Sequence, residues 1–378
     1  MKTKFAVRNL HILFIFLFLH SCSQQKNTNT TLGKAGFKTF RTVDKSRTYK
    51  PGTDTSNILH YRPVDLDVWY PAQVSTTDTT LFFKNLFGLL LTRSDFYTGT
   101  PAPKGVLNQI AQSFSTGFHC SDTTQLLNYK TSSYPNAKTA NGKFPLIVYL
   151  SSFNSMCYEN FPLFEELASN GYVVASINSI GRYPGDMTMK NDDLLQQVFD
   201  AVASVNYLEN NHNIDFSKIG IIGYSWGGLA GAILQNKLSN VKCLISFDGS
   251  EFHHYGEAKD ENTDFEEIKS SDNFKSMNIN IPYLRLESSP IANSFKKDSV
   301  YNFSEKLIGK NLILKIDSAE HQDFSCLPFI TRTSGNCQNN SFYTTSIKLT
   351  IAYLNDHLKN TNSFSETLNE VGKKVVKK

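Results

Sequence analysis

The chain has 378 residues, of which 40% are hydrophobic and 12% are aromatic. This composition excludes an intrinsically disordered chain, and the length allows one large α/β domain or two smaller ones. The formal net charge is +4 at pH 7, and the six cysteines are scattered rather than spaced as metal-ligand pairs. No metal site is therefore predicted.

The N-terminus has the pattern of an export signal. Basic residues precede an apolar run at residues 10–19, which is too short to span a bilayer. The run ends in LHSC, residues 19–22, which resembles the lipobox of bacterial lipoproteins. This resemblance implies removal of residues 1–21 and lipidation of Cys22; the alternative is an ordinary cleaved signal. We expect an exported, periplasmic or outer-membrane-associated chain, tethered to a membrane through residues 22–35.

The pattern after the tether predicts one domain over residues 36–360. Residues 63–70 alternate apolar and polar side chains, as in a half-buried strand. Continuous apolar runs, which are typical of strands buried on both faces, follow at residues 145–150, 172–177, 219–224, 242–247, 282–286 and 311–316.

Helical patterns separate these runs. One begins near Asn191, the expected N-cap, and repeats apolar residues from Leu194 to Val205. Strands that alternate with helices predict a doubly wound, mostly parallel α/β sheet flanked by helices. Further helices are expected near residues 160–169, 226–237 and 341–358.

Residues 81–135 do not fit this alternation. Their apolar runs at 81–83 and 86–91 are separated by polar residues, and a glycine interrupts the second run. One interpretation is an insertion packed on the core. The other is a lid or a membrane-facing apolar surface.

The C-terminal residues 361–378 contain the only obvious basic cluster, and we expect a solvated tail rather than a nucleic-acid-binding arm. Loss of residues 1–21 would lower the net charge to about +1. Export permits disulfides, and Cys326 with Cys337 is the best-placed local pair. Cys243 lies in an apolar strand, where a buried thiol is expected.

The stretch GYSWG, residues 223–227, matches the Gly-x-Ser-x-Gly pattern of a nucleophile elbow. It lies between an apolar strand and a helix of small residues, which is the context that this pattern requires. The two glycines allow strand and helix to approach closely, so that the serine oxygen is exposed beside the helix N-terminus. Ser225 is therefore the predicted nucleophile.

A serine nucleophile needs a base, and the base needs a carboxylate that holds its tautomer. His321 follows the last predicted strand, on a loop that can bring its imidazole over the serine. The histidines at 253–254 come too early, and His357 lies inside the final helix. Asp248 and Glu287 end two successive strands, and spacing alone does not decide between them as the acid.

These motifs resemble a known family. GYSWGG at 223–228, an aspartate that ends the next strand, AEHQDF at 319–324 and VWYPA at 68–72 are similar to plasma-type platelet-activating-factor acetylhydrolases and their bacterial relatives, which are grouped with dienelactone-hydrolase-like enzymes. The likeness covers about residues 60–355 and is confined to motifs. It implies the α/β-hydrolase fold, a cofactor-free serine esterase acting on lipid or small-molecule acyl esters, and Asp248 as the acid.

The chain departs from that family after the third predicted strand. Family members carry His-Gly there, and the next backbone N–H helps to bind the oxyanion, whereas this chain has LSSFN at residues 150–154. By resemblance, the backbone N–H groups of Phe153 and Trp226 form the oxyanion hole. A hydroxyl of Ser151 or Ser152 is a further candidate donor. Losing one such donor costs about 3 kcal/mol of transition-state stabilisation.

The sequence therefore predicts an exported, lipid-anchored serine esterase in which Ser225, His321 and Asp248 form a catalytic triad. One alternative is a non-catalytic binding lipoprotein on a hydrolase scaffold, which the altered loop favours. Another is a peptidase or polysaccharide deacylase, because fold and triad do not choose the substrate. No cofactor and no nucleic-acid partner are expected, and the sequence does not predict the acyl-chain length or the oligomeric state.

Overall fold

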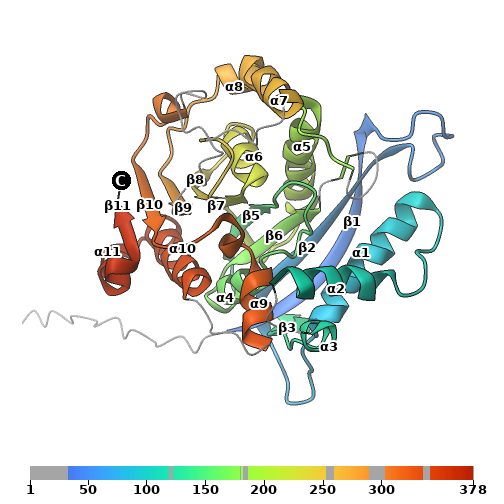
Figure 1. Ribbon diagram of the computed structural model, residues 1–378, viewed down its shortest axis with the longest axis horizontal. Coiled ribbons are helices and arrows are strands. Elements are labelled where there is room, and N and C mark those ends of the chain that lie inside the picture. The colour runs from blue at the N-terminus through green and yellow to red at the C-terminus, as the bar shows by residue number, and fades with distance from the viewer. Residues whose placement is uncertain are drawn as a thin grey trace, which may run out of the picture. The chain divides into compact units, whose positions relative to one another are not determined.

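The computed structural model describes residues 33–118, 122–178, 180–181, 186–252, 259–288, 303–334 and 341–377. Within these ranges the chain forms one eleven-stranded sheet with helices on both faces (Figure 1). The strands are β1 (Lys34–Thr48), β2 (Tyr61–Gln73), β3 (Ser133–Pro135), β4 (Lys138–Thr139), β5 (Phe144–Leu150), β6 (Val173–Asn178), β7 (Ile214–Tyr224), β8 (Val241–Phe247), β9 (Tyr283–Glu287), β10 (Asn311–Ile316) and β11 (Val375–Lys377). The helices are α1 (Phe83–Thr98), α2 (Val106–Phe118), α3 (Thr123–Leu127), α4 (Phe161–Ser169), α5 (Asn191–Leu208), α6 (Trp226–Leu234), α7 (Lys259–Ser270), α8 (Asp272–Lys275), α9 (Cys326–Ser334), α10 (Phe342–Lys359) and α11 (Phe364–Val371). Short 3-10 helices are η1 (Phe303–Lys306), η2 (His321–Phe324) and η3 (Gly372–Lys374).

The centre of the sheet is parallel. The strand order is β11-β10-β9-β8-β7-β5-β6-β2-β1-β3, with β4 beside β2. Neighbouring strands from β10 to β6 run parallel, whereas β11 and β2 pair antiparallel with the two ends of this centre. The six predicted apolar runs are the strands β5 to β10, so the predicted doubly wound, mostly parallel sheet is confirmed.

Two hydrophobic cores lie on opposite faces of the sheet. Ile147 and Tyr149 of β5 are buried with side chains of α1, α4 and α10, whereas Leu146 and Val148 are buried with side chains of α5 and α6. This division follows from the alternation of side chains along a strand. Because β6 and β7 lie on opposite sides of β5, the carboxyl ends of β5 and β7 form the switch point at which such sheets bind ligands.

Strand β2 is buried almost throughout, so the prediction of a half-buried strand over residues 63–70 was wrong about its exposure. The polar positions of the alternating pattern are covered as well. Asp65 accepts a hydrogen bond from Arg41 at 2.6 Å, and Asp67 accepts one from Arg93 at 2.6 Å. Pairing with arginine allows carboxylates to be buried in the sheet.

The predicted helices are present with shifted ends. Helix α6 ends at Leu234 rather than at residue 237, and α5 begins at Asn191. The N-cap of α5 is Lys190 rather than Asn191, which was the predicted cap. The carboxylate of Asp193 in the first turn of α5 accepts hydrogen bonds from the backbone N–H and the hydroxyl of Thr188. The side chain of Asp193, rather than that of Asn191, therefore holds the segment that precedes the helix.

The described part of residues 81–135 forms α1, α2 and α3 beside the sheet and β3 at its edge, next to β1. In α1, Phe83, Leu86 and Phe87 are fully buried, and Phe83 stacks on Phe87 and on Phe161 of α4. The first of the two interpretations, a packed insertion, therefore describes these apolar residues.

Residues 364–377 form α11, η3 and β11 on the domain, so the segment is not a free tail, although its lysines are in solvent as predicted. Phe364, Leu368 and Val371 repeat at helical spacing in α11 and pack against the core. Strand β11 then pairs with β10 and extends the sheet. Lys373 and Lys374 are exposed, because burial of the apolar face leaves the charged side chains in solvent.

Three cysteines of the described residues, Cys157, Cys243 and Cys326, are buried free thiols. Cys243 lies in β8, as predicted, and burial raises the pKa of its thiol to about 12. The expected pairing of Cys326 with Cys337 is not formed, because Cys326 is packed in the core at the start of α9. Cys337 and the expected lipidation site Cys22 lie outside the described residues. No helix in the described ranges is long and apolar enough to cross a membrane.

Candidate active site

Ser225 lies on a strained turn between β7 and α6. Its backbone has φ 53° and ψ −118°, in a region that non-glycine residues rarely adopt. A Cβ on Gly223 would lie 2.1 Å from the carbonyl oxygen of Gly227, and a Cβ on Gly227 would lie 2.0 Å from that of Leu150. Both positions therefore require glycine, and their close packing holds the serine at the carboxyl end of the sheet.

A chain of two hydrogen bonds links Ser225, His321 and Asp248. The Nε2 atom of His321 lies 3.0 Å from the hydroxyl oxygen of Ser225, and its Nδ1 atom lies 2.7 Å from Oδ2 of Asp248. With the proton on Nδ1 donated to the carboxylate, Nε2 accepts the serine hydroxyl. The side chain of His321 is 43% exposed and that of Asp248 is 4% exposed. The imidazole is therefore open to solvent, and the carboxylate is enclosed.

Asp248 follows β8 and is held by further donors. Ser288 donates its backbone N–H to Oδ1 at 3.1 Å and its hydroxyl to Oδ2 at 2.8 Å. The guanidinium of Arg285 lies 3.5 Å from Oδ1. Glu287, the alternative acid, is buried beside Arg285 at 3.2 Å. Of the two candidate acids, the structure brings Asp248 to the imidazole of His321.

The backbone of the histidine is fixed by the residue that precedes the serine. The hydroxyl of Tyr224 donates to the carbonyl oxygen of His321 at 2.9 Å, and the two rings lie 5.1 Å apart. Burial raises the pKa of Tyr224 well above its ordinary value, so that this donor stays protonated. The elbow therefore also anchors the loop that carries His321.

The loop after β5 lies beside the elbow. The rings of Phe153 and Trp226 meet edge to face with centroids 6.0 Å apart. Trp226 is the first residue of α6, and the N–H groups of a first turn point out of the helix. The hydroxyl of Ser152 donates to Glu159 at 2.6 Å, so this candidate oxyanion donor is engaged elsewhere. Ser151 is buried, and its carbonyl accepts the side-chain amide of Gln197 at 2.8 Å.

The other candidate residues are accounted for as follows. His357 lies in α10, packs edge to face against Tyr353 with ring centroids 4.4 Å apart and is half-buried. Residues 253–254 lie outside the described ranges. In the described part of the chain, no group of three or more His, Cys, Asp or Glu side chains is placed to hold a metal ion.

Several contacts of the site were not predicted from the sequence. Tyr224, Ser288 and Arg285 adjoin residues that were singled out as nucleophile or acid, but their partners lie far away along the chain. Glu159 is near its partner Ser152 in sequence, but burial rather than any motif distinguishes it.

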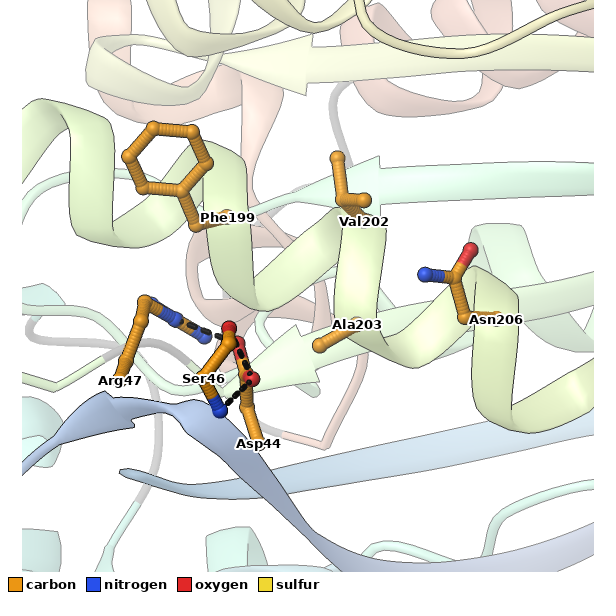
Figure 2. A pocket seen from close by; sticks show the side chains of 7 residues that line it. All are labelled: Asp44, Ser46, Arg47, Phe199, Val202, Ala203 and Asn206. Atoms are coloured by element: carbon orange, nitrogen blue, oxygen red, sulfur yellow. Dashed lines mark hydrogen bonds and ion pairs between the residues drawn. The ribbon is translucent and has the colours of Figure 1, made fainter. Parts of the chain in front are cut away.

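A separate pocket of about 350 Å³ opens between β1 and α5. Figure 2 shows Phe199, Val202, Ala203 and Asn206 of α5 on one side and Asp44, Ser46 and Arg47 of β1 on the other. Arg47 is bound to Asp44 at 2.6 Å and to the buried Asp200 at 2.7 Å. None of the residues at Ser225 lines this pocket.

Comparisons with known proteins give one family match, to a region that contains Ser225, and similarities of fold to solved structures. The family of the BAAT/acyl-CoA thioester hydrolase C-terminal domain matches residues 201–307, which include Ser225 and Asp248. The match covers less than half of the chain and ends before His321. No curated protein matches the sequence.

Two solved structures are similar. The ferulic acid esterase from Streptomyces cinnamoneus has a TM-score of 0.62 and 18% identity, over 92% of this chain and 97% of that one. The acylaminoacyl peptidase from Pyrococcus horikoshii has a TM-score of 0.48 and 13% identity, over 87% of this chain and 43% of that one. The parallel sheet, the elbow and the similarity to the esterase structure together show that the chain has the α/β-hydrolase fold.

Proposed function

We propose that the chain is a serine hydrolase that cleaves carboxylic esters, with Ser225 as nucleophile, His321 as general base and Asp248 as the acid that orients the imidazole. The observation that carries this proposal is the continuous contact from the serine hydroxyl to Nε2 at 3.0 Å and from Nδ1 to the carboxylate at 2.7 Å. The partial match to a thioester hydrolase domain supports hydrolase chemistry.

In the proposed reaction, the hydroxyl oxygen of Ser225 attacks the ester carbonyl while its proton passes to Nε2 of His321. The backbone N–H groups of Phe153 and Trp226 stabilise the oxyanion. The imidazolium returns its proton to the departing alcohol, which leaves an acyl-serine. Water then attacks the acyl-serine with the same histidine as base, releasing the carboxylic acid and regenerating the hydroxyl.

The substrate classes are esters of small molecules or lipids and, as a second candidate, thioesters. The resemblance of the motifs to acetylhydrolases supports an acyl ester, and the described activity of the matched family supports a thioester. The two classes share the acyl-enzyme and differ in the leaving group. Turnover of p-nitrophenyl acetate and of acetyl-CoA by the same preparation distinguishes them.

The decisive experiment uses a fluorophosphonate probe, which reacts with an activated serine. We expect the wild-type chain to be labelled and the Ser225→Ala variant to remain unlabelled, with p-nitrophenyl acetate turnover lost in parallel. Equal labelling and turnover of both proteins would remove Ser225 from the mechanism. A folded wild-type chain that turned over neither ester nor thioester would favour the binding-protein alternative.

We also propose that the chain is exported and anchored through a lipidated Cys22. The sequence pattern at residues 19–22 is the support for this proposal. Expression in bacteria fed an alkyne-labelled fatty acid should label the wild-type chain. The Cys22→Ser variant should lose the label and leave the membrane fraction, and a variant that kept the label would contradict the anchor.

A further inference from the structure

The carboxylate of Glu159 is bound on both of its oxygens by the residue that precedes Phe153. Oε1 accepts the backbone N–H of Ser152 at 2.8 Å, and Oε2 accepts the hydroxyl of the same serine at 2.6 Å. Oε1 also accepts the hydroxyl of Tyr149 at 2.8 Å. One carboxylate therefore fixes both the backbone and the side chain of Ser152. The next peptide, whose N–H belongs to Phe153, is attached directly to this fixed residue.

This carboxylate is buried, and the donors described in the previous paragraph, Ser152 and Tyr149, are uncharged. Glu159 is 3% exposed, and its burial raises the pKa of the carboxyl. Burial of a carboxylate is unfavourable unless hydrogen bonds replace its hydration. The bonds from Ser152 and Tyr149 supply part of that replacement, and displacement of Ser152 would remove two of them.

The same short segment is tied to the strand and loop on either side. Asn160 donates to the hydroxyl of Tyr149 at 2.7 Å and to the carbonyl of Phe324 at 3.0 Å. The carbonyl of Glu159 accepts the backbone N–H of Cys326 at 2.8 Å. Phe324 and Cys326 follow His321 in the chain. The anchor of the loop is therefore held rigidly against the segment that carries the histidine.

We infer that Glu159 is a positioning residue, whose carboxylate holds Ser152 so that the backbone N–H of Phe153 faces the developing oxyanion at Ser225. The inference rests on the proposed function. It explains how a loop with two serines in place of His-Gly is held in shape, and it assigns to Ser152 a structural bond rather than a direct one to the oxyanion.

The test compares two buried glutamates with similar partners. Glu165 on α4 accepts the backbone N–H of Ser132 and the hydroxyl of Ser133, as Glu159 does from Ser152, but it has no contact with the site. Glu159→Gln introduces an amide N–H₂ against these donors and displaces the loop. Glu165→Gln makes the same chemical change elsewhere, so it controls for the general effect on folding.

We expect Glu159→Gln to lower kcat for p-nitrophenyl acetate by roughly 10- to 100-fold, because a displacement of about 1 Å can cost this much. KM should change by less than about threefold. The pH midpoint of kcat/KM should match the wild type, because the histidine and its acid are untouched. Glu165→Gln should keep kcat within about twofold of the wild type.

The outcomes separate this inference from the proposed function. If Ser225→Ala abolishes turnover but Glu159→Gln matches Glu165→Gln in kcat, the positioning role is overturned and the nucleophile stands. If Ser225→Ala retains wild-type turnover, both fall. Should Glu159→Gln not fold, Ser152→Ala removes only the hydroxyl bond and is expected to lower kcat by about 3- to 10-fold. An unchanged kcat in that folded variant would overturn the inference.

Discussion

Two regions of the sheet bury an aspartate against a nitrogen base, and they differ in what the base can do. In β2, Asp67 pairs with Arg93 at 2.6 Å, and both side chains are enclosed. After β8, Asp248 pairs with His321, which faces Ser225 on its other side. Arginine stays protonated in proteins, whereas imidazole exchanges its proton near neutral pH. The first pair can only hold the fold, and the second is suited to moving a proton.

The backbone differs between the two regions in the same sense. Asp67 lies in a regular strand pair between β1 and β2, whereas Ser225 and Asp248 have φ of 53° and 43°. Strain of this kind persists only where the surrounding structure enforces it, and it concentrates at functional sites. The comparison predicts that changes in the first region lower stability and that changes in the second lower activity.

The largest expected effect on activity is that of Asp248→Asn. The amide cannot stabilise the imidazolium or select its tautomer, so kcat should fall by roughly 10⁴-fold while the fold is kept. Glu287→Gln is the matched control. It should keep kcat within about tenfold of the wild type, because Glu287 contacts Arg285 rather than the imidazole of His321. Steady-state kinetics with p-nitrophenyl acetate decide the point. Loss of turnover in the glutamine variant alone would reverse the assignment of the acid.

The largest expected effect on stability is that of Arg93→Met. This change leaves Asp67 buried without its cation, which costs roughly 3–5 kcal/mol of the free energy of unfolding. Arg41→Met is the control, because the side chain of Arg41 is 27% exposed in its pair with Asp65. This substitution should lower the free energy of unfolding by about 1 kcal/mol. Urea unfolding measures both. Equal losses in the two variants would contradict the proposed importance of enclosure.

A third buried acid, Glu165, is held by serine donors and should contribute to the pH dependence of stability. Burial raises the pKa of its carboxyl from 4.5 to about 8. Between these values the unfolded chain has lost the proton that the folded chain keeps. The free energy of unfolding should therefore fall as pH rises, by at most about 1.4 kcal/mol per pH unit, and level off above pH 8.

Removing the carboxyl tests this sign directly. Glu165→Gln should remove this contribution, so the wild-type protein should lose stability relative to this variant between pH 5.5 and 7.5. Unfolding by urea at the two pH values measures the difference. If the free energy of unfolding of the wild-type protein rose relative to that of the variant over this range, the carboxyl of Glu165 would be ionised in the folded chain.

The smallest expected effect is that of Ser288→Ala. The backbone N–H of Ser288 still reaches Asp248, so only the hydroxyl bond is lost, at a cost of about 1 kcal/mol, or roughly fivefold in kcat. Ser46→Ala removes an exposed hydroxyl from Asp44 and should leave kcat unchanged. If the two variants behave alike in steady-state kinetics, the hydroxyl of Ser288 does not contribute to the orientation of the acid.

The sheet was largely predictable because its strands are continuous apolar runs, and the elbow was predictable because its glycines are required by local geometry. Local patterns failed where distant partners decide the outcome. The alternation around Asp65 and Asp67 indicated solvent on one face, but arginines from β1 and α1 cover it. The lysines near the C-terminus indicated a solvated tail, whereas this segment contains an amphipathic helix, α11, and an edge strand, β11.

The candidate site shows the same limit. Ser225 follows from five adjacent residues, and His321 from its place after the last strand. The choice between Asp248 and Glu287 depends on which strand end faces the imidazole, and spacing along the chain does not contain that information. Glu159 belongs to no motif, and its bonds to Ser152 become visible only in the folded chain.

The hydrogen-only side chain of Gly227 sets how closely the elbow approaches the end of β5. Because even a methyl group there would overlap the carbonyl of Leu150, the elbow and the end of β5 stand at the minimum separation that a polypeptide allows. Redesign of substrate preference should therefore target the ring of Phe153 and the surrounding loops. A larger residue at position 227 would push the elbow away from the end of β5, whatever the substrate.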